Sequence, residues 1–211
     1  MGARAIESVA LSTSDAEATT EAEGRSDVWS LQALAGRLVE VTQRGAGTAM
    51  TWATELLWQA QQQGEPTAWI CTGSRLPFAP DIIRYGVDVE ACAVVRAVAA
   101  QQAAVAADKL LRSGAFGLVV LDLGEQADIP TALLGRLTKL AQTHSAMVLV
   151  LTESEEASAA LGSLVSLRLL AERDAEERSG ESRLRLTAIK DKRQGPGWSD
   201  SLPVQHPLGV R

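Results

Sequence analysis

Short apolar runs alternate with longer amphipathic segments along most of this chain. Several of the short runs are apolar throughout, which is typical of strands that are covered on both faces of a sheet. They predict strands over Arg37–Thr42, Thr67–Thr72, Ala91–Val95, Phe116–Asp122 and Ala146–Thr152. The amphipathic segments between them predict helices over Ala49–Gln63, Ala97–Ser113 and Ile129–Thr143, with Asp128 as a candidate N-cap for the last.

The order of these elements is the pattern of a parallel sheet, in which each helix crosses over to the next strand with a right-handed connection. Two further strands are expected over Leu164–Leu170 and Leu184–Lys190, and the acidic segment between them indicates an antiparallel hairpin at the sheet edge. The predicted fold class is therefore α/β, with a mostly parallel central sheet, flanking helices and an antiparallel C-terminal edge hairpin.

The distribution of charge divides the chain into three parts. Residues 1–27 hold six acids against two arginines and show no helical periodicity, so we expect a disordered acidic N-terminal tail. Residues 28–197 carry the predicted elements and form the expected domain, and residues 198–211 form a C-terminal tail punctuated by proline. The net charge is −6, but the sign reverses between Arg183 and Trp198, where five bases face one aspartate.

The apolar runs are too short to cross a membrane. The longest, such as Phe116–Leu121 and Ala146–Leu151, fall far below the roughly 18 to 20 residues that a spanning helix needs, and the N-terminus has no signal-peptide pattern. A cytoplasmic location is expected. Cys71 and Cys92 lie inside apolar runs and predict buried reduced thiols, and with two histidines the chain has no set of soft ligands for a metal.

Several segments resemble, in order and spacing, the core of the RecA-family recombinases. They are Gly36–Val41 (GRLVEV), TAWIC, Tyr85–Glu90 (YGVDVE), Arg112–Leu123 (RSGAFGLVVLDL) and the C-terminal LRLTAIKDKRQGPG. The resemblance runs from about Gly36 to Gly197 and implies a RecA-like domain. Among degenerate RecA relatives the chain looks most like the ImuA group of bacterial mutagenesis proteins, because of the basic C-terminal strand and turn from Leu184 to Gly195.

The loop after the first strand departs from the family pattern. A working phosphate loop needs glycine N–H groups, a lysine for the phosphates and a Ser or Thr hydroxyl for Mg²⁺. Here Gln43 and Thr48 take the two glycine positions, while Ala49 and Met50 take those of the lysine and the hydroxyl. A shifted register aligns Gly45 and Gly47 better and brings in Thr51, yet it supplies no lysine, and Arg44 is the loop's one charge.

The other catalytic positions are degenerate as well. Gly73 stands at or near the place of the family's general-base glutamate, and Asp122 matches the acidic residue that helps to hold Mg²⁺, although an aspartate there also caps a turn. We therefore expect no catalytic residues, no ATP hydrolysis, no cofactor and no metal, with weak nucleotide binding through Arg44 left open. The segments in place of the family's DNA-contacting loops begin at Gly124 and Glu153 and are short and acidic, so DNA contact is expected only indirectly or weakly.

Surfaces are then expected to carry the function. Trp58 falls on the polar face of its helix, among Thr51, Glu55 and Gln62, as an anchor for a partner or as a residue covered by another segment of the chain. Lys190 and Lys192 match two family lysines that reach across a filament interface to the neighbour's nucleotide; together with Arg193 they could instead form a solvated strand end. Trp198 begins a tail that is apolar enough to dock on another surface.

The resemblance to the ImuA group implies an accessory role in SOS-induced, error-prone translesion DNA synthesis. The implied partners are RecA, the inactive Y-family polymerase homologue ImuB and an error-prone replicative-type polymerase. One alternative is a cell-division inhibitor of the SulA type, which binds the tubulin-like division protein. Another is an active ATPase of the RadA or KaiC kind, which would require ATP turnover that depends on Asp122.

Overall fold

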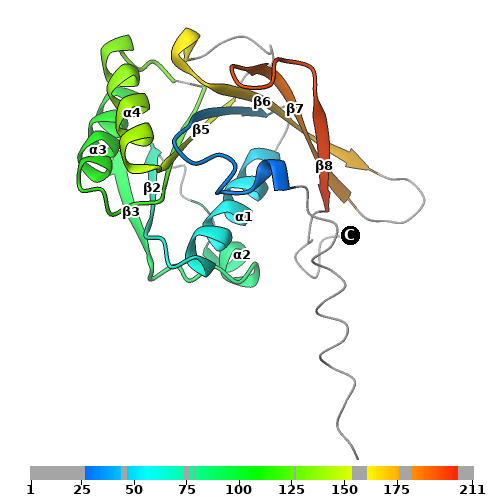
Figure 1. Ribbon diagram of the computed structural model, residues 1–211. Coiled ribbons are helices and arrows are strands. Elements are labelled where there is room, and N and C mark those ends of the chain that lie inside the picture. The colour runs from blue at the N-terminus through cyan, green and yellow to red at the C-terminus, as the bar shows by residue number, and fades with distance from the viewer. Residues whose placement is uncertain are drawn as a thin grey trace, which may run out of the picture.

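The computed structural model describes residues 27–43, 47–73, 77, 79–125, 127–153, 161–175 and 182–203. Within these residues, eight strands form a single sheet in the order β3-β2-β4-β5-β1-β6-β7-β8 (Figure 1). The strands are β1 (Leu38–Gln43), β2 (Thr67–Thr72), β3 (Cys92–Ala97), β4 (Leu118–Gly124), β5 (Met147–Glu153), β6 (Leu167–Ala175), β7 (Ser182–Asp191) and β8 (Ser199–Pro203). The expected N-terminal tail lies outside the described residues except for Asp27, and so do residues 204–211.

Strands β1 to β6 pair in parallel and form the central part of the sheet. β4 is buried along its whole length, as its uninterrupted apolar run predicts for a strand covered on both faces. One face packs against α1 (Thr48–Gln62) and α2 (Ala79–Arg84), and the other against α3 (Ala100–Arg112) and α4 (Thr131–His144) (Figure 1). The predicted α/β class with a mostly parallel sheet is confirmed.

Antiparallel strands extend the sheet on its C-terminal side. β6 pairs with β7 and β7 pairs with β8, so the predicted hairpin is confirmed and a third strand lies beyond it. The expected start of the first hairpin strand at Leu164 is wrong, because Gly162–Leu164 forms the 3₁₀ helix η3 and the strand begins at Leu167. Strand β8 falls in the segment that the sequence indicated as a tail, while residues 176–181 at the hairpin tip lie outside the described residues.

Three tryptophans fasten the two ends of the described chain to α1. Trp29, in the 3₁₀ helix η2 (Asp27–Trp29), stacks on Trp198 with ring centroids 4.5 Å apart and meets Trp52 of α1 edge-on at 6.0 Å. Trp29 and Trp52 are fully buried and Trp198 is half-buried. Stacked and edge-on aromatic pairs add to the stabilisation that burial alone provides, so this cluster holds η2 and the approach to β8 against the core.

Two helix boundaries follow local chemistry that the sequence pattern did not reveal. The N-cap of α4 is Pro130 and no side chain caps the helix, so the expected capping role of Asp128 is wrong. The N-cap of α1 is Gly47 in the left-handed conformation, with φ at +84°, which a glycine adopts without a steric penalty. In the described part of the chain, no helix is both long and apolar enough to cross a membrane.

Candidate functional site

The loop after β1 leaves the sheet at the carboxyl end of this strand, which lies between β5 and β6. In open α/β sheets, ligands bind in the crevice outside the carboxyl ends of the parallel strands. The side chains at this edge include Thr42 and Gln43 from β1, Asp122 from β4, and Thr152 and Glu153 from β5. Arg44 and Gly45 of the predicted loop lie outside the described residues.

Gln43 occupies the start of the following helix with its own side chain. Its Oε1 accepts a hydrogen bond of 3.0 Å from the backbone N–H of Ala49, in the first turn of α1, and its Nε2 donates to Glu153 Oε1 at 3.1 Å. The first N–H groups of a helix have no partner within the helix, which is why they bind phosphate in nucleotide-binding proteins. Here the neutral Gln43 carboxamide accepts the N–H of Ala49, and the Glu153 carboxylate in turn accepts from Gln43.

The residues that the resemblance aligns with the lysine and the hydroxyl, Ala49 and Met50, pack in or against the core. Ala49 is 1% exposed and packs in the core, so a longer side chain has no room there. Met50 is half-buried against the same core. Thr48 Oγ1 lies 3.5 Å from the carbonyl of Ala171, and Thr51 Oγ1 donates to the carbonyl of Gly47 at 3.0 Å. Both hydroxyls are therefore turned to backbone oxygens.

Asp122 is present at the expected edge and is 1% exposed. It lies opposite Cys71 in the pairing of β4 with β2, and burial together with the nearby Asp122 carboxylate raises the pKa of the Cys71 thiol. Gly73, which the resemblance places at or near the general base, follows β2 in an exposed left-handed turn with φ at +62°. Among the described residues, no group of three or more His, Cys, Asp or Glu is placed to hold a metal ion.

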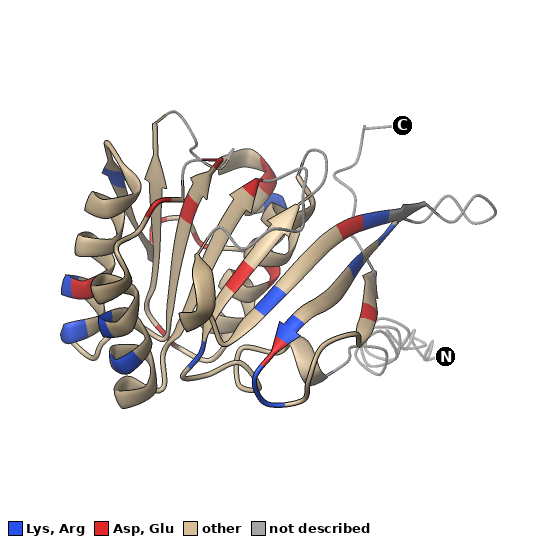
Figure 2. Ribbon diagram, turned by 90° about the horizontal axis from the view of Figure 1, so that it is seen from above, with Lys and Arg blue, Asp and Glu red and all other residues tan. Residues whose placement is uncertain are grey.

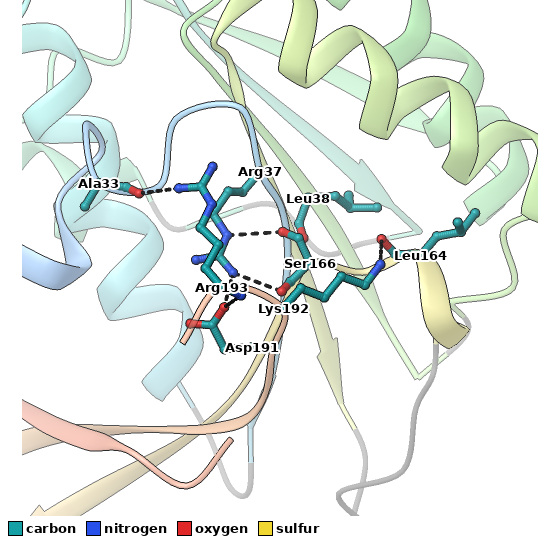
Figure 3. Close-up of polar contacts among 8 residues, drawn as sticks. All are labelled: Ala33, Arg37, Leu38, Leu164, Ser166, Asp191, Lys192 and Arg193. Carbon is teal, nitrogen blue, oxygen red and sulfur yellow. Dashed lines mark hydrogen bonds and ion pairs between the residues drawn. The ribbon is translucent and has the colours of Figure 1, made fainter. Parts of the chain in front are cut away.

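The basic turn, residues 190–193 at the end of β7, is fixed by a buried ion pair. Arg37, just before β1, lies 2.6 Å from Asp191 at the end of β7, and the two side chains are 5% and 0% exposed (Figure 3). Arg37 also donates to the hydroxyl and the carbonyl of Ser166, and Asp191 Oδ1 accepts from the backbone N–H of Arg193 at 2.8 Å. Burial alone would raise the pKa of Asp191, but these hydrogen bonds and the Arg37 charge hold it below the usual range.

Both lysines of the basic turn contact η3, which precedes β6. Lys190 Nζ donates to the carbonyl of Ser163 at 2.8 Å, and Lys192 Nζ donates to the carbonyl of Leu164 at 3.3 Å (Figure 3 shows the second contact). The Arg193 guanidinium donates to the carbonyl of Ala33 at 3.3 Å. An ammonium carries three donors, so each lysine keeps two N–H groups for another ligand.

A second buried ion pair lies beside Lys190. Arg168 of β6 donates from Nε to Glu40 of β1 at 2.8 Å, and the two side chains are 7% and 0% exposed. Arg168 is the register partner of Lys190. Burial, Lys192 and Arg168 lower the pKa of Lys190, in that order. Positive charge is therefore concentrated at this end of β6 and β7.

The two tryptophans that the sequence indicated as partner anchors both contact their own chain. Trp58 is half-buried, and a Cβ placed on Gly86 would lie 3.4 Å from its ring. The polar face assigned to its helix is wrong at Glu55, which is 7% exposed because Gln59 and the Tyr85 hydroxyl bond to its carboxylate. Trp198 stacks on Trp29. A role of either tryptophan in binding a partner stays a prediction.

The structure brings together Lys190, Lys192 and Arg193, as expected from their spacing, and places Trp58 on a different face. The pairs that fix the basic turn were missed at the sequence level, although charged residues inside apolar strands, Glu40 in LVEV and Arg168 in LRLL, were a usable signal. In comparisons with known proteins, no family model matches the chain and no curated protein matches it in sequence.

Proposed function

We propose that this chain is a RecA-like adaptor without ATPase activity that serves SOS-induced, error-prone translesion DNA synthesis by binding RecA and an ImuB-type polymerase homologue. The mostly parallel sheet with antiparallel strands on one side supports the RecA-like reading of the sequence. The more specific assignment to the ImuA group rests on the C-terminal motif from Leu184 to Gly195.

One observation carries the absence of nucleotide chemistry: the Gln43 carboxamide occupies the N–H of Ala49 at the start of α1. A phosphate at this helix end would have to displace that hydrogen bond while facing Glu153, which is held by the same glutamine. The phosphate and the Glu153 carboxylate are both negative and repel each other. No lysine occurs between Arg44 and Lys109 to offset this repulsion. The cost of binding a nucleotide rises and the usual source of its binding energy is missing.

The binding role rests on the rigid presentation of two lysines. The Arg37–Asp191 pair fixes the end of β7, and the η3 carbonyls orient the Lys190 and Lys192 ammonium groups. Since the side chains are already ordered, little conformational entropy is lost when they contact a partner. A filament of RecA with bound ATP offers phosphate oxygens at its exposed end, which suit two adjacent ammonium groups.

The nucleotide part of this proposal is tested by titrating the purified chain with Mg·ATP and Mg·ADP in a calorimeter and by measuring phosphate release. The expected result is no saturable heat at millimolar nucleotide and no turnover above buffer. A dissociation constant in the micromolar range, or turnover that Asp122→Asn abolishes, contradicts the proposal and favours an ATPase of the RadA or KaiC kind.

The binding part is tested by biolayer interferometry with the full chain immobilised. RecA is presented free and as an ATP-loaded filament on single-stranded DNA, and an ImuB-type homologue is presented separately. The proposal predicts stronger binding to the filament than to free RecA, or binding to the polymerase homologue. Binding to the polymerase homologue should not require added nucleotide. No binding to any of the three contradicts it.

A further inference from the structure

A second cationic surface lies on the helical face opposite α1, far in sequence from the basic turn. Lys109 and Arg112 come from α3, and Arg136 and Lys139 come from α4. Residues three apart on a helix share one side, so each lysine lies beside the arginine of its own helix. The two arginines meet because both contact Asp108, which joins the pairs into one surface on neighbouring helices, seen as blue segments on the two helices at the left of Figure 2.

Asp108 arranges the two guanidinium groups for binding. Its carboxylate accepts Arg136 Nε at 3.0 Å and Arg112 Nε at 2.9 Å, and it also lies 3.0 Å from Arg136 Nη2. The carboxylate side chain is 6% exposed, whereas those of Arg112 and Arg136 are 61% and 51% exposed. A guanidinium carries five N–H donors, so both arginines retain donors that point away from Asp108 and fit a second carboxylate.

The net charge of this surface is opposite in sign to that of the whole chain. The four cations and Asp108 give it a formal charge of +3, with His144 neutral, whereas the whole chain carries −6. The opposite charge is concentrated before the described residues: positions 5–25 hold Glu7, Asp15, Glu17, Glu21 and Glu23 against Arg25, a formal charge of −4. The formal charges of the cationic surface and of residues 5–25 are opposite in sign and similar in magnitude.

The chain is long enough to join them. Residues 27–36 span at most about 32 Å, at roughly 3.5 Å per residue. They end at Gly36, where a Cβ would lie 3.6 Å from the Cα of Gln142 in α4. Gln142 is about 4.5 Å along the helix from Lys139. Asp15 lies twelve residues before Asp27, and that stretch reaches about 42 Å when extended. Asp15 and the earlier Glu7 can therefore reach the cationic surface even if residues 27–36 are fully extended.

We infer that the cationic surface formed by Lys109, Arg112, Arg136 and Lys139 binds the acidic N-terminal segment of the same molecule, residues 5–25. The segment neutralises the surface and covers it against other anions, such as the phosphates of nucleic acid. This assignment is independent of the proposed RecA and polymerase partners, because it involves other basic residues than Lys190 and Lys192.

The chain's four lysines provide the test, since two lie on this surface and two, Lys190 and Lys192, lie in the basic turn. The full chain is treated with a water-soluble carbodiimide, which activates a carboxylate so that a lysine amine forms an amide and a urea leaves. Trypsin cleaves after Arg4 and Arg25 and releases the acidic segment as one peptide. Mass spectrometry then identifies the lysine to which this peptide is joined.

The expected result, in the monomer at low salt, is about fivefold or more cross-linking to Lys109 and Lys139 over Lys190 and Lys192, lost at 1 M salt because screening shortens the reach of the charges to roughly 3 Å. Arg112→Gln, which leaves Asp108 bonded to Arg136, should reduce it severalfold. Arg185→Gln, at an exposed arginine of β7, is the matched control and should not change it.

Three outcomes overturn the inference. Equal labelling of all four lysines means that the segment has no preferred site, and cross-links confined to covalent dimers mean that a second copy supplies it. Absence of cross-links to Lys109 and Lys139, with binding of a labelled single-stranded oligonucleotide that Arg112→Gln weakens, would assign the surface to nucleic acid instead.

Discussion

Replacement of Asp191 by asparagine tests whether a buried ion pair holds the basic turn. Asp191→Asn keeps the size of the side chain but leaves the Arg37 guanidinium, 5% exposed, without its countercharge. Removing one partner of a buried pair costs about 3–5 kcal/mol, and the hydrogen bonds from Arg37 to Ser166 remain, so we expect about 3 kcal/mol. For a domain of this size that corresponds to a fall in Tm of roughly 6–12 °C.

The assay is equilibrium unfolding in urea at pH 7, followed by tryptophan fluorescence. Asp108→Asn is the matched control, since the arginines that contact Asp108 are 61% and 51% exposed and water replaces the lost charge, at a cost of about 1 kcal/mol. If Asp191→Asn lowers the free energy of unfolding by less than about 1 kcal/mol, or by no more than the control does, burial does not make this ion pair important for stability.

Three further predictions concern the same regions. Ala49→Lys should lower the free energy of unfolding by about 3 kcal/mol or more, because the site is buried, and should create no Mg·ATP binding in calorimetry; micromolar binding would contradict the account of Gln43. Asp191 has a folded-state pKa below its unfolded value, so its contribution is present above about pH 4 and is lost as pH falls. The urea midpoints of wild type and Asp191→Asn should therefore converge below about pH 4, and a constant gap would show that this carboxylate does not titrate with unfolding. Trp198→Ala removes the stack on Trp29 and should cost about 2 kcal/mol in urea unfolding; an unchanged midpoint would show that strand pairing alone holds β8.

Most of the central sheet was predictable because β1, β2, β4 and β5 are buried on both faces and therefore read as apolar runs. Strands β1 to β5 were expected within two residues of their observed bounds, and α1, α3 and α4 within three, whereas β6 was expected over Leu164–Leu170 and runs from Leu167 to Ala175. The short elements were not predicted. α2 has six residues, too few for a helical periodicity, and β8 (SDSLP) is polar and ends in proline, so neither has the composition that marks such elements.

The contacts of the candidate site could not be predicted from the sequence. The sequence alone shows only that Ala49 and Gly73 carry no ionisable side chain. That Gln43 bonds to the N–H of Ala49, or that Lys190 and Lys192 contact η3, depends on segments that only the fold brings together. Glu55 shows the same limit, since helical spacing placed it on a polar face and Tyr85, thirty residues away in sequence, helps to bury it.

The central claim is that surfaces, rather than a nucleotide site, carry the function. Its most direct test compares the affinity for the ATP-loaded RecA filament of the wild type, of the double variant Lys190→Ala and Lys192→Ala, and of Lys109→Ala and Lys139→Ala, which removes the other two lysines. The account predicts about tenfold weaker binding or more when the basic turn loses both ammonium groups, and about twofold or less for the control pair. Equal affinities for all three proteins would contradict it.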